Sequence, residues 1–552
     1  MKSFKPDSIQ ELKGPISKNS ALTVARPPAA HRPLPSPTIS PQREFKSFSH
    51  LLDGFEHQSR RYTSDRVEFL LLLLAAEMDT VPENILQRFF VAANCSTLDK
   101  SLENLIEFAR TSDGRSDLAS KNMLTTTLNL CQSLSYPSCG GTLLLALKLI
   151  RNLCAGEPRN QNSFIEQNGV NIVADIISAK ELVKDSNYGM IRMGLQVLAN
   201  VSLAGREHQI VVWKRVYSTE FVEIAKIRRK ETCDPLCMIV YACVEENHEL
   251  LDQLCSDHAL PLLVEIVYTA LAVPLEEDWL RLILTKACIE ESYFTPVFSK
   301  LQHETSDRNS PEMHTYTQAQ SFLLSILSEM VNEQIEHITL SNVFALDVFN
   351  ILKTTLGVLN CVSRPESTLP TSFPDINVLG YSLCILRDIC AFDGHMDIVD
   401  SLLSLGLIQT LIDLLRDLEP PSIIRKTLNR AENQDSTTYS GKLCPYKGFR
   451  SDIVAVIGNC AYKRKQVQDE IRDRNGILLM LQQCVTDDEN PFLREWGIWG
   501  VRNLLEGNLE NQKVVSDLEI QGSVNLSELT TLGLRVDVDQ QTRRAKLVNT
   551  TG

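Results

Sequence analysis

The sequence predicts an all-α protein built from stacked helical repeats, and three observations lead to that prediction. Helix-breaking residues are scarce, because the 552 residues include only 24 Gly and 23 Pro, and eight of the prolines lie at or before Pro41. Hydrophobic residues make up 43% of the chain and recur at helical spacing over most of it. A short polar motif also returns at similar intervals, which indicates an internal repeat.

The repeating unit is an apolar helix that ends in a three-residue motif, followed by a polar or glycine-containing turn and a second amphipathic helix. Asn152 and Asn459 each precede a glycine by 17 residues, and Asp388 precedes one by 18. The copies therefore share one internal plan. The motif occurs at Arg151-Asn152-Leu153, Ala199-Asn200-Val201, Arg387-Asp388-Ile389, Gly458-Asn459-Cys460 and Arg502-Asn503-Leu504.

The interval between motifs indicates the kind of repeat. Asn152 and Asn200 are 48 residues apart, and Asn459 and Asn503 are 44 residues apart. Repeats of roughly 40 to 47 residues with two or three helices are typical of armadillo and HEAT proteins. Since one helix pair cannot bury its own apolar face, the copies must stack. We therefore expect an armadillo/HEAT-like α-solenoid, a right-handed superhelix of stacked helical repeats.

Shifts in composition divide the chain into segments. The first, 1–45, is a Pro/Ser-rich tail that we expect to be disordered, because it cannot bury enough apolar surface to offset the entropy of ordering. The others are N-terminal armadillo-like repeats over 46–300, an exposed loop over 301–320, middle helical repeats over 321–416, a loop over 417–443, a C-terminal domain over 444–520 and a polar tail over 521–552.

Charge and cysteine content narrow the choice of partner and compartment. The net charge of −14 gives no reason to bind nucleic acid, which needs clustered Lys and Arg. The N-terminus has no apolar signal segment, and the longest apolar run, 69–76, is far shorter than the roughly 20 residues of a membrane span. The 15 cysteines form no Cys-x-x-Cys pair. We expect free core thiols in a cytoplasmic protein without a membrane span.

The sequence also lacks the patterns that carry chemistry. It contains no dinucleotide-binding, Walker, metalloprotease, nucleophile-elbow or EF-hand motif. The acids Asp487, Asp488 and Glu489 lack the alternating ligands and distal Glu of a calcium loop, and no apolar pocket separates their pKa values. We therefore expect no catalytic residue, no metal site and no cofactor.

The stretch from Asp487 to Gln512 is better explained as architecture. We predict that Asn490 caps a helix whose first turn begins with Pro491, where proline costs no hydrogen bond. The acids at 487–489 then lie by the positive end of the helix dipole. Gly497 and Gly500 would let another backbone approach the same helix closely.

An aromatic stripe follows along this predicted helix. Phe492, Trp496, Trp499 and Asn503 are spaced so that they line one helix face. A tryptophan stripe at this spacing is more often part of a core than of a binding site. We therefore predict that the two tryptophans pack inside the repeat array.

The motif asparagines are the strongest candidates for partner binding. A side-chain amide carries a donor and an acceptor, so it matches the backbone of an extended peptide. A ladder of Asn152, Asn200, Asn459 and Asn503 would grip such a partner, as in armadillo proteins. The alternative is that each Asn caps or bridges the loop after its helix. Arg502 would add a charge-assisted contact, or pair with a local acid.

The stretch from Cys444 to Gln512 goes beyond a generic repeat and resembles the C-terminal domain of the ataxin-10 family. About 70 residues carry dense matches in the same order. The matching elements are Pro445-Tyr446-Lys447-Gly448, Arg450, Asp452, Gly458-Asn459, Gln468-Asp469, Arg472, Gly476, Asp488, Asn490-Pro491-Phe492, Glu495-Trp496, Arg502-Asn503-Leu504 and Asn508 through Gln512.

This resemblance implies a cytoplasmic, armadillo-like adaptor without enzymatic activity, connected with cytokinesis and intracellular signalling. It implies protein partners, among them a G-protein β subunit and a sugar transferase that acts on intracellular proteins. The main alternative is a transport adaptor of the importin or β-catenin kind. A third reading is an enzyme that uses the carboxylates of 487–489 or the Cys460 thiol. Whether copies of the chain form a homo-oligomer stays open.

Overall fold

The computed structural model describes residues 95–217, 219–275, 277–302, 315–356, 368–424, 441–517, 534–538 and 545–549, all within one compact unit. The helices are α3 (Cys95–Phe108), α4 (Ser112–Ser120), α5 (Met123–Ser133), α6 (Gly140–Leu153), α7 (Pro158–Glu166), α8 (Gly169–Ile177), α9 (Lys180–Lys184), α10 (Tyr188–Ser202), α11 (Arg206–Val216), α12 (Thr219–Ala225), α13 (Lys230–Val244), α14 (His248–Leu254), α15 (Leu260–Ala272), α16 (Trp279–Leu284), η3 (Thr285–Glu290), α17 (Phe294–Lys300), α18 (Gln318–Gln334), α19 (Asn342–Thr355), α20 (Pro374–Ala391), η5 (Asp393–His395), α21 (Met396–Ser404), α22 (Leu407–Asp417), α24 (Phe449–Ala461), α25 (Lys465–Asp473), α26 (Gly476–Leu481), α27 (Leu493–Leu505) and α28 (Leu509–Ser516).

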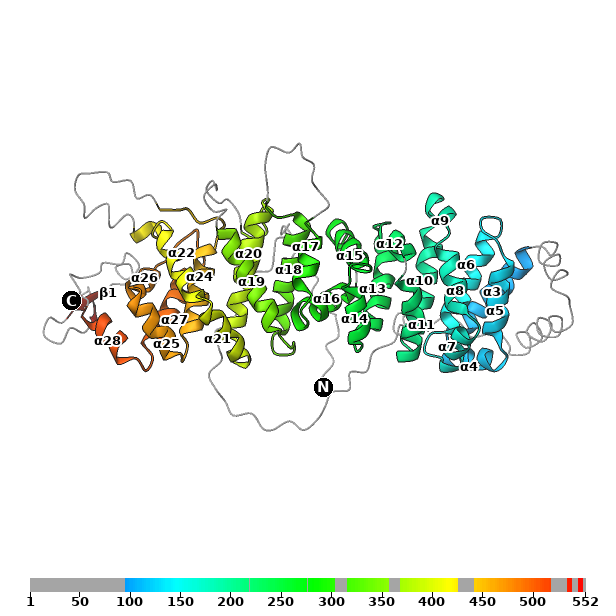
Figure 1. The fold of residues 1–552 in the computed structure, drawn as a ribbon, viewed down its shortest axis with the longest axis horizontal. Coiled ribbons are helices and arrows are strands. Elements are labelled where there is room, and N and C mark those ends of the chain that lie inside the picture. Colours follow the sequence, from blue (N-terminus) through cyan, green and yellow to red (C-terminus); the bar gives the residue numbers. More distant parts are fainter. Residues whose placement is uncertain are drawn as a thin grey trace, which may run out of the picture. The chain divides into compact units, whose positions relative to one another are not determined.

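One series of helices runs through the whole array, and each member packs against the member before it and the member after it (Figure 1). The shorter helices between them complete each repeat, as α8 does against α10 and α26 against α27. The predicted all-α, armadillo-like solenoid is therefore confirmed. We call this series the ladder helices; it consists of α3, α6, α10, α13, α16, α18, α20, α24 and α27.

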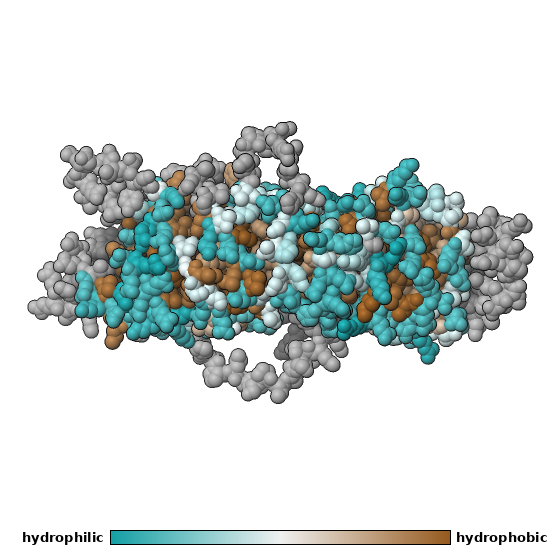
Figure 2. Space-filling view, viewed as in Figure 1, coloured by the Kyte–Doolittle hydropathy of each residue, from teal (hydrophilic) through white to brown (hydrophobic). Residues whose placement is uncertain are grey.

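Ladder helices inside the array, such as α13, α20 and α24, are buried on most sides because neighbours cover them from several directions. In α24, for example, α20, α22 and α27 leave Asp452 as the one partly exposed position between Phe449 and Ala461. On the face shown in Figure 2, hydrophilic residues cover much of the described surface and apolar residues gather in separate patches. The core is thus a continuous layer that passes from repeat to repeat.

The repeated glycine marks the same structural position in different repeats. Gly169 opens α8 and Gly476 opens α26, each directly after an asparagine in the left-handed conformation. A Cβ atom on Gly169 would lie 2.6 Å from the ring of Phe164 in the preceding helix. The constant offset in the sequence therefore reflects a tight packing requirement rather than chance.

Two long connections follow α17 and α22. The positions 303–314 and 425–440 lie outside the described residues, as does the tail predicted over 1–45. At the base of the second connection, the Lys442 backbone N–H donates to the Asp417 carbonyl (2.8 Å), and the Glu419 N–H donates to the Lys442 carbonyl (2.9 Å). These two hydrogen bonds join the ends of the connection.

A small hairpin lies in the predicted polar tail. β1 (Leu534–Val538) pairs antiparallel with β2 (Ala545–Asn549), with Leu534 opposite Asn549 and Val538 opposite Ala545. This hairpin was not predicted from the sequence.

Two expectations from the sequence concern membrane spans and cysteines. No single helix among the described residues is long and apolar enough to cross a bilayer, although the segments Asp393–Ser404 and Leu407–Asp417, bent by 66°, meet that test as a pair. The apolar run 69–76 lies outside the described residues. The cysteines within the described part of the chain are free and mostly buried, as predicted.

Candidate protein-docking surface

The motif asparagines fasten each ladder helix to the one before it. The side-chain N–H of Asn152 donates to the Ile106 carbonyl on α3 (3.1 Å), and that of Asn200 donates to the Arg151 carbonyl on α6 (3.0 Å). The C-terminal copies repeat this arrangement. Asn459 donates to the Arg387 carbonyl (3.1 Å), and Asn503 donates to the Gly458 carbonyl (2.9 Å).

These bonds explain where the four asparagines lie. All four are buried, with exposed fractions from 1% for Asn503 to 7% for Asn459. Their donor N–H groups are engaged by carbonyls of the chain itself. This placement favours a bridging role over peptide docking, although the bridge leads to the preceding ladder helix and not to the loop after the asparagine. The sequence identified asparagine as a hydrogen-bonding residue of the motif. The carbonyl that accepts its hydrogen bond lies in another repeat.

The arginine that precedes the motif residue points the other way, toward the following ladder helix. In α6, Arg151 donates to the Asn152 side-chain oxygen (2.8 Å) and to the Gln196 amide oxygen on α10 (3.2 Å). In α20, Arg387 donates to Asp388 (2.9 Å) and to Asp452 on α24 (2.9 Å). The motif therefore links three successive ladder helices.

Around Arg387 this arrangement becomes a partly buried charge cluster. The Tyr446 hydroxyl donates to the second carboxylate oxygen of Asp452 (2.7 Å). Burial raises the pKa of the Asp452 carboxyl, although the charge of Arg387 and both hydrogen bonds oppose that shift. Burial also raises the pKa of the Tyr446 hydroxyl well above its ordinary range. The ion pair of this cluster was not predicted from the sequence, because Arg387 and Asp452 lie 65 positions apart along the chain.

The last ladder helix, α27, presents the most accessible part of the motif. No ladder helix follows it in the described chain, and Arg502 is exposed, with its guanidinium 4.9 Å from the centre of the Trp499 ring. Trp499 is partly exposed, as is Trp496, which packs against the core. Ile498 and Glu495 are exposed on the same helix. These side chains form a mixed aromatic and charged surface.

The predicted cap of α27 is wrong. The helix begins at Leu493, and Phe492 before it adopts φ 63° and is 48% exposed, so neither Phe492 nor the exposed Pro491 belongs to the first turn. Asn490 instead accepts from the Arg450 backbone N–H in the first turn of α24 (3.0 Å). Asn490 therefore does cap a helix, but that helix is α24 in the preceding repeat and not α27.

The glycines of α27 behave as predicted and bring backbones together. A Cβ atom on Gly497 would lie 2.6 Å from the Gln483 carbonyl oxygen. A Cβ atom on Gly458 in α24 would lie 2.9 Å from the Cα atom of Gly500. The two ladder helices thus touch through their main chains at this crossing.

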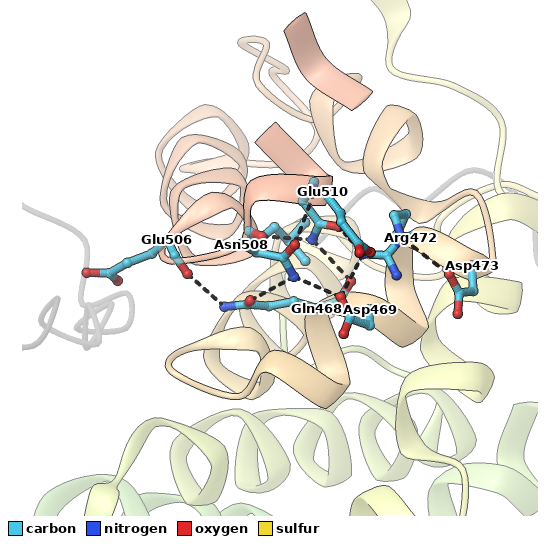
Figure 3. A network of polar contacts seen from close by, with 9 residues as sticks. Gln468, Asp469, Arg472, Asp473, Glu506, Asn508 and Glu510 are labelled. Carbon is cyan, nitrogen blue, oxygen red and sulfur yellow. Dashed lines mark hydrogen bonds and ion pairs between the residues drawn. The ribbon is translucent and has the colours of Figure 1, made fainter. Parts of the chain in front are cut away.

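A polar network closes the C-terminal end of the array (Figure 3). The side-chain N–H₂ of Gln468 on α25 donates to the carbonyls of Ala461, Asn503 and Glu506, at 3.2, 2.9 and 3.3 Å. Its amide oxygen accepts from Asn508 (3.2 Å). The side chain therefore satisfies carbonyls at the ends of two ladder helices at once.

A second part of this network fixes α28. Arg472 donates to Asp469 (2.6 Å) and to the Asn511 side-chain oxygen (3.0 Å), and it pairs with Glu510 (3.0 Å; Figure 3). Asn511 donates to the Leu504 carbonyl at the end of α27 (2.9 Å). The α25–α27–α28 corner is therefore held by contacts between side chains as well as by side-chain bonds to the main chain.

The first repeats contain the same device, which was not predicted from the sequence. Gln161, nine residues after its motif asparagine, donates to the Asn200 carbonyl (2.9 Å), just as Gln468 donates to the Asn503 carbonyl nine residues after Asn459. Asn160 donates to the Leu153 carbonyl (2.8 Å). The shared offset of nine residues was a signal available in the sequence.

No group of three or more His, Cys, Asp or Glu side chains in the described part of the chain is placed to hold a metal ion. The charged groups found there form pairs of arginine or lysine with carboxylates, and side-chain amides add hydrogen bonds to them. What this arrangement offers is a rigid row of helices that carries charged and aromatic side chains.

Comparison with known proteins points to one family. A family described as the spinocerebellar ataxia type 10 protein domain matches residues 449–548. The chain is similar to ataxin-10 of Macaca fascicularis (26% identical) and of Homo sapiens (27%), each over 71% of this chain and 78% of the relative. It is 42% identical to the ataxin-10 homolog of Dictyostelium discoideum over 17% of this chain and 15% of that protein.

A designed armadillo repeat protein of known structure is 12% identical, with a TM-score of 0.30, and the match covers 58% of this chain and 99% of that chain.

Proposed function

Since this chain belongs to the ataxin-10 family, we propose that it is a non-enzymatic scaffold for protein–protein interactions. The observation that carries the proposal is the series of ladder helices, bonded to one another through buried asparagines and partly buried arginines. Binding residues placed on rigid elements keep their geometry better than residues on loops. Exposed side chains such as Arg502 are then held in place before a partner arrives.

The cellular role follows from the family. We propose a cytoplasmic adaptor in cytokinesis and intracellular signalling, with a G-protein β subunit and an intracellular sugar transferase as candidate partners. Loss of such an adaptor should leave cells with two nuclei. Re-expression of the wild-type chain should restore division, and a variant that has lost partner binding should not.

A purified system tests the scaffold directly. The full chain is mixed with a purified G-protein β subunit, and amide hydrogen exchange is followed with and without it. We expect slower exchange in α24 and α27, and weaker binding by Arg502→Glu than by Lys513→Glu, an equal charge change at an exposed position on α28. Unchanged exchange throughout, or equal loss in both variants, would remove this partner and this surface from the proposal.

The alternative is a transport adaptor that binds extended peptides along the ladder helices. Such an adaptor would pass between cytoplasm and nucleus. A tagged chain that accumulates in the nucleus when nuclear export is blocked would favour this alternative. A distribution that does not change would count against it.

A further inference from the structure

Four basic side chains lie on three successive elements of the N-terminal array. Lys148 and Arg151 are one turn apart on α6, Arg192 is on α10, and Arg229 directly precedes α13. The Arg151 guanidinium bonds to Gln196, one turn after Arg192 on α10, so these groups share the surface where α6 meets α10. We call these four residues the basic row.

Arg229 reaches the same surface from the next repeat. Its guanidinium carbon lies 4.5 Å from the centre of the Tyr188 ring, and Tyr188 is one turn before Arg192 on α10. The cation–π contact therefore places the Arg229 charge over α10, beside the helix face that carries Arg192. The basic row is continuous across two repeat boundaries.

The basic row has no carboxylate partner among the described residues. Arg151 bonds only to the amide oxygens of Asn152 and Gln196, and Arg192 is exposed without an ion pair in that part of the chain. Burial lowers the pKa of Arg151, and the positive charges of Arg192 and Arg110 lower it further. The neighbours that influence this arginine are thus cations.

Two ladder helices farther along the chain, α16 and α20, pair their arginines with carboxylates, whereas Arg502 on α27 is exposed. Arg281 on α16 pairs with Glu333 at 2.9 Å and with Glu329 at 3.6 Å. Arg387 on α20 pairs with Asp388 and Asp452, each at 2.9 Å. In a chain whose net charge is −14, the basic row brings four basic groups together without a carboxylate partner among the described residues.

We propose that the basic row binds an extended acidic segment of a partner protein. The proposal rests on the scaffold function and adds the chemistry of the partner. Packed helices are about 8–10 Å apart, and an extended chain advances about 3.3 Å per residue. A segment that crosses from α6 to α10 would therefore advance about three residues between the Arg151 charge and the Arg192 and Arg229 charges. Arg151, Arg192 and Arg229 each take a carboxylate, and the Tyr188 ring supports the last of them.

The test uses the full chain and a synthetic fluorescent peptide with glutamate at every third position, separated by Gly and Ser. The control peptide carries lysine in place of glutamate. Fluorescence anisotropy should show binding of the glutamate peptide only, and added salt should weaken it. Arg192→Glu/Arg229→Glu should lower the affinity at least about ten-fold, whereas Arg192→Lys/Arg229→Lys should retain most of it.

Arg206→Glu supplies the matched control. Arg206 is exposed on α11 in the same region but outside the ladder helices, so its reversal changes net charge without touching the basic row. Circular dichroism first verifies that each variant is folded. Failure of the wild-type chain to bind the glutamate peptide, or an equal loss in Arg206→Glu, overturns the acidic-segment proposal. Binding of the G-protein β subunit is measured separately through Arg502, so the scaffold proposal stands or falls on its own result.

Discussion

The side-chain amide of Asn503 donates to the main-chain carbonyl of Gly458, 2.9 Å away on the neighbouring ladder helix. Asn459, next in the chain to Gly458, donates in the same way to the Arg387 carbonyl one repeat earlier. Each motif thus offers a carbonyl to the following repeat and takes one from the preceding repeat. The polar motif of this chain joins neighbouring ladder helices by hydrogen bonds. The charged side chain of Arg502 beside it is exposed.

Asn503→Ala should destabilise the C-terminal repeats. The substitution leaves the Gly458 carbonyl without its donor in a buried site, which costs about 1–3 kcal/mol. Asn503→Asp should cost more, because a carboxylate oxygen would then face that carbonyl. Urea unfolding of the full chain measures the effect. Asn162→Ala, at an exposed position of α7, is the control and should unfold like the wild type.

If Asn503→Ala unfolds like the wild type but loses a partner, the asparagine belongs to a docking site after all, and the bridging role is refuted.

Gly458→Ala should disturb the crossing of α24 and α27. The added Cβ atom would lie 2.9 Å from the Cα atom of Gly500, and two backbones cannot move apart without loss of packing. We expect a loss of about 1–3 kcal/mol in unfolding free energy. Gly189→Ala on α10 is the matched control, because no atom lies within 4 Å of its added Cβ. That variant should be unchanged or slightly more stable, since alanine favours helix.

A stable Gly458→Ala protein would mean that the two ladder helices separate easily at this point.

The fold was readable from the sequence because its determinants are local or periodic. The apolar spacing, the recurring motif and the glycine after Asn168 or Asn475 all reflect contacts within one or two neighbouring helices. The close approach through Gly497 was predictable for the same reason, because a glycine in a helix usually serves close packing. The hairpin of β1 and β2 was missed, although Leu534 to Val538 alternates apolar and polar residues, which is the pattern of a strand.

The hydrogen-bonding partners of the polar side chains could not be predicted from the sequence, because they lie far away along the chain and meet only in the folded structure. Asn490 has the composition and position of a cap for α27, yet it serves α24, whose first turn lies 40 residues earlier. The Arg387–Asp452 pair joins residues 65 apart. One sequence shows which side chains can form such bonds, but the register of the stacked helices selects the partner.

A comparison of wild type with Asp452→Asn should show how protonation of the Asp452 carboxyl changes the free energy of unfolding. Burial raises the pKa of this carboxyl above its ordinary value of 3.8, against the opposing effects of Arg387 and Tyr446. The folded state therefore binds the proton more tightly than the unfolded state does. The stability from this group is fully present below the unfolded pKa and is lost as pH rises through the folded pKa. The stability advantage of wild type over Asp452→Asn should thus shrink as the pH rises between these two pKa values, by about 1.4 kcal/mol for each pH unit between them.

Urea unfolding at a series of pH values, from about 4 to about 7, measures that difference. The exposed Asp488→Asn variant serves as the reference and should run parallel to the wild type. An advantage that grows with pH would show that the ion pair with Arg387 outweighs burial.

Gln468→Ala should loosen the C-terminal corner more than Gln161→Ala loosens the first repeats. Gln468 donates to three carbonyls and accepts from Asn508, whereas the Gln161 side chain has one bond, to Asn200. Each buried carbonyl that loses its donor costs about 1–3 kcal/mol, and water that enters at the corner offsets part of that cost. Amide hydrogen exchange should therefore accelerate first in α27 and α28 of Gln468→Ala, while α24 keeps its protection. Uniform acceleration across all repeats would instead indicate that this glutamine stabilises the array as a whole, and equal effects of the two variants would show that only the shared bond to the ladder carbonyl matters.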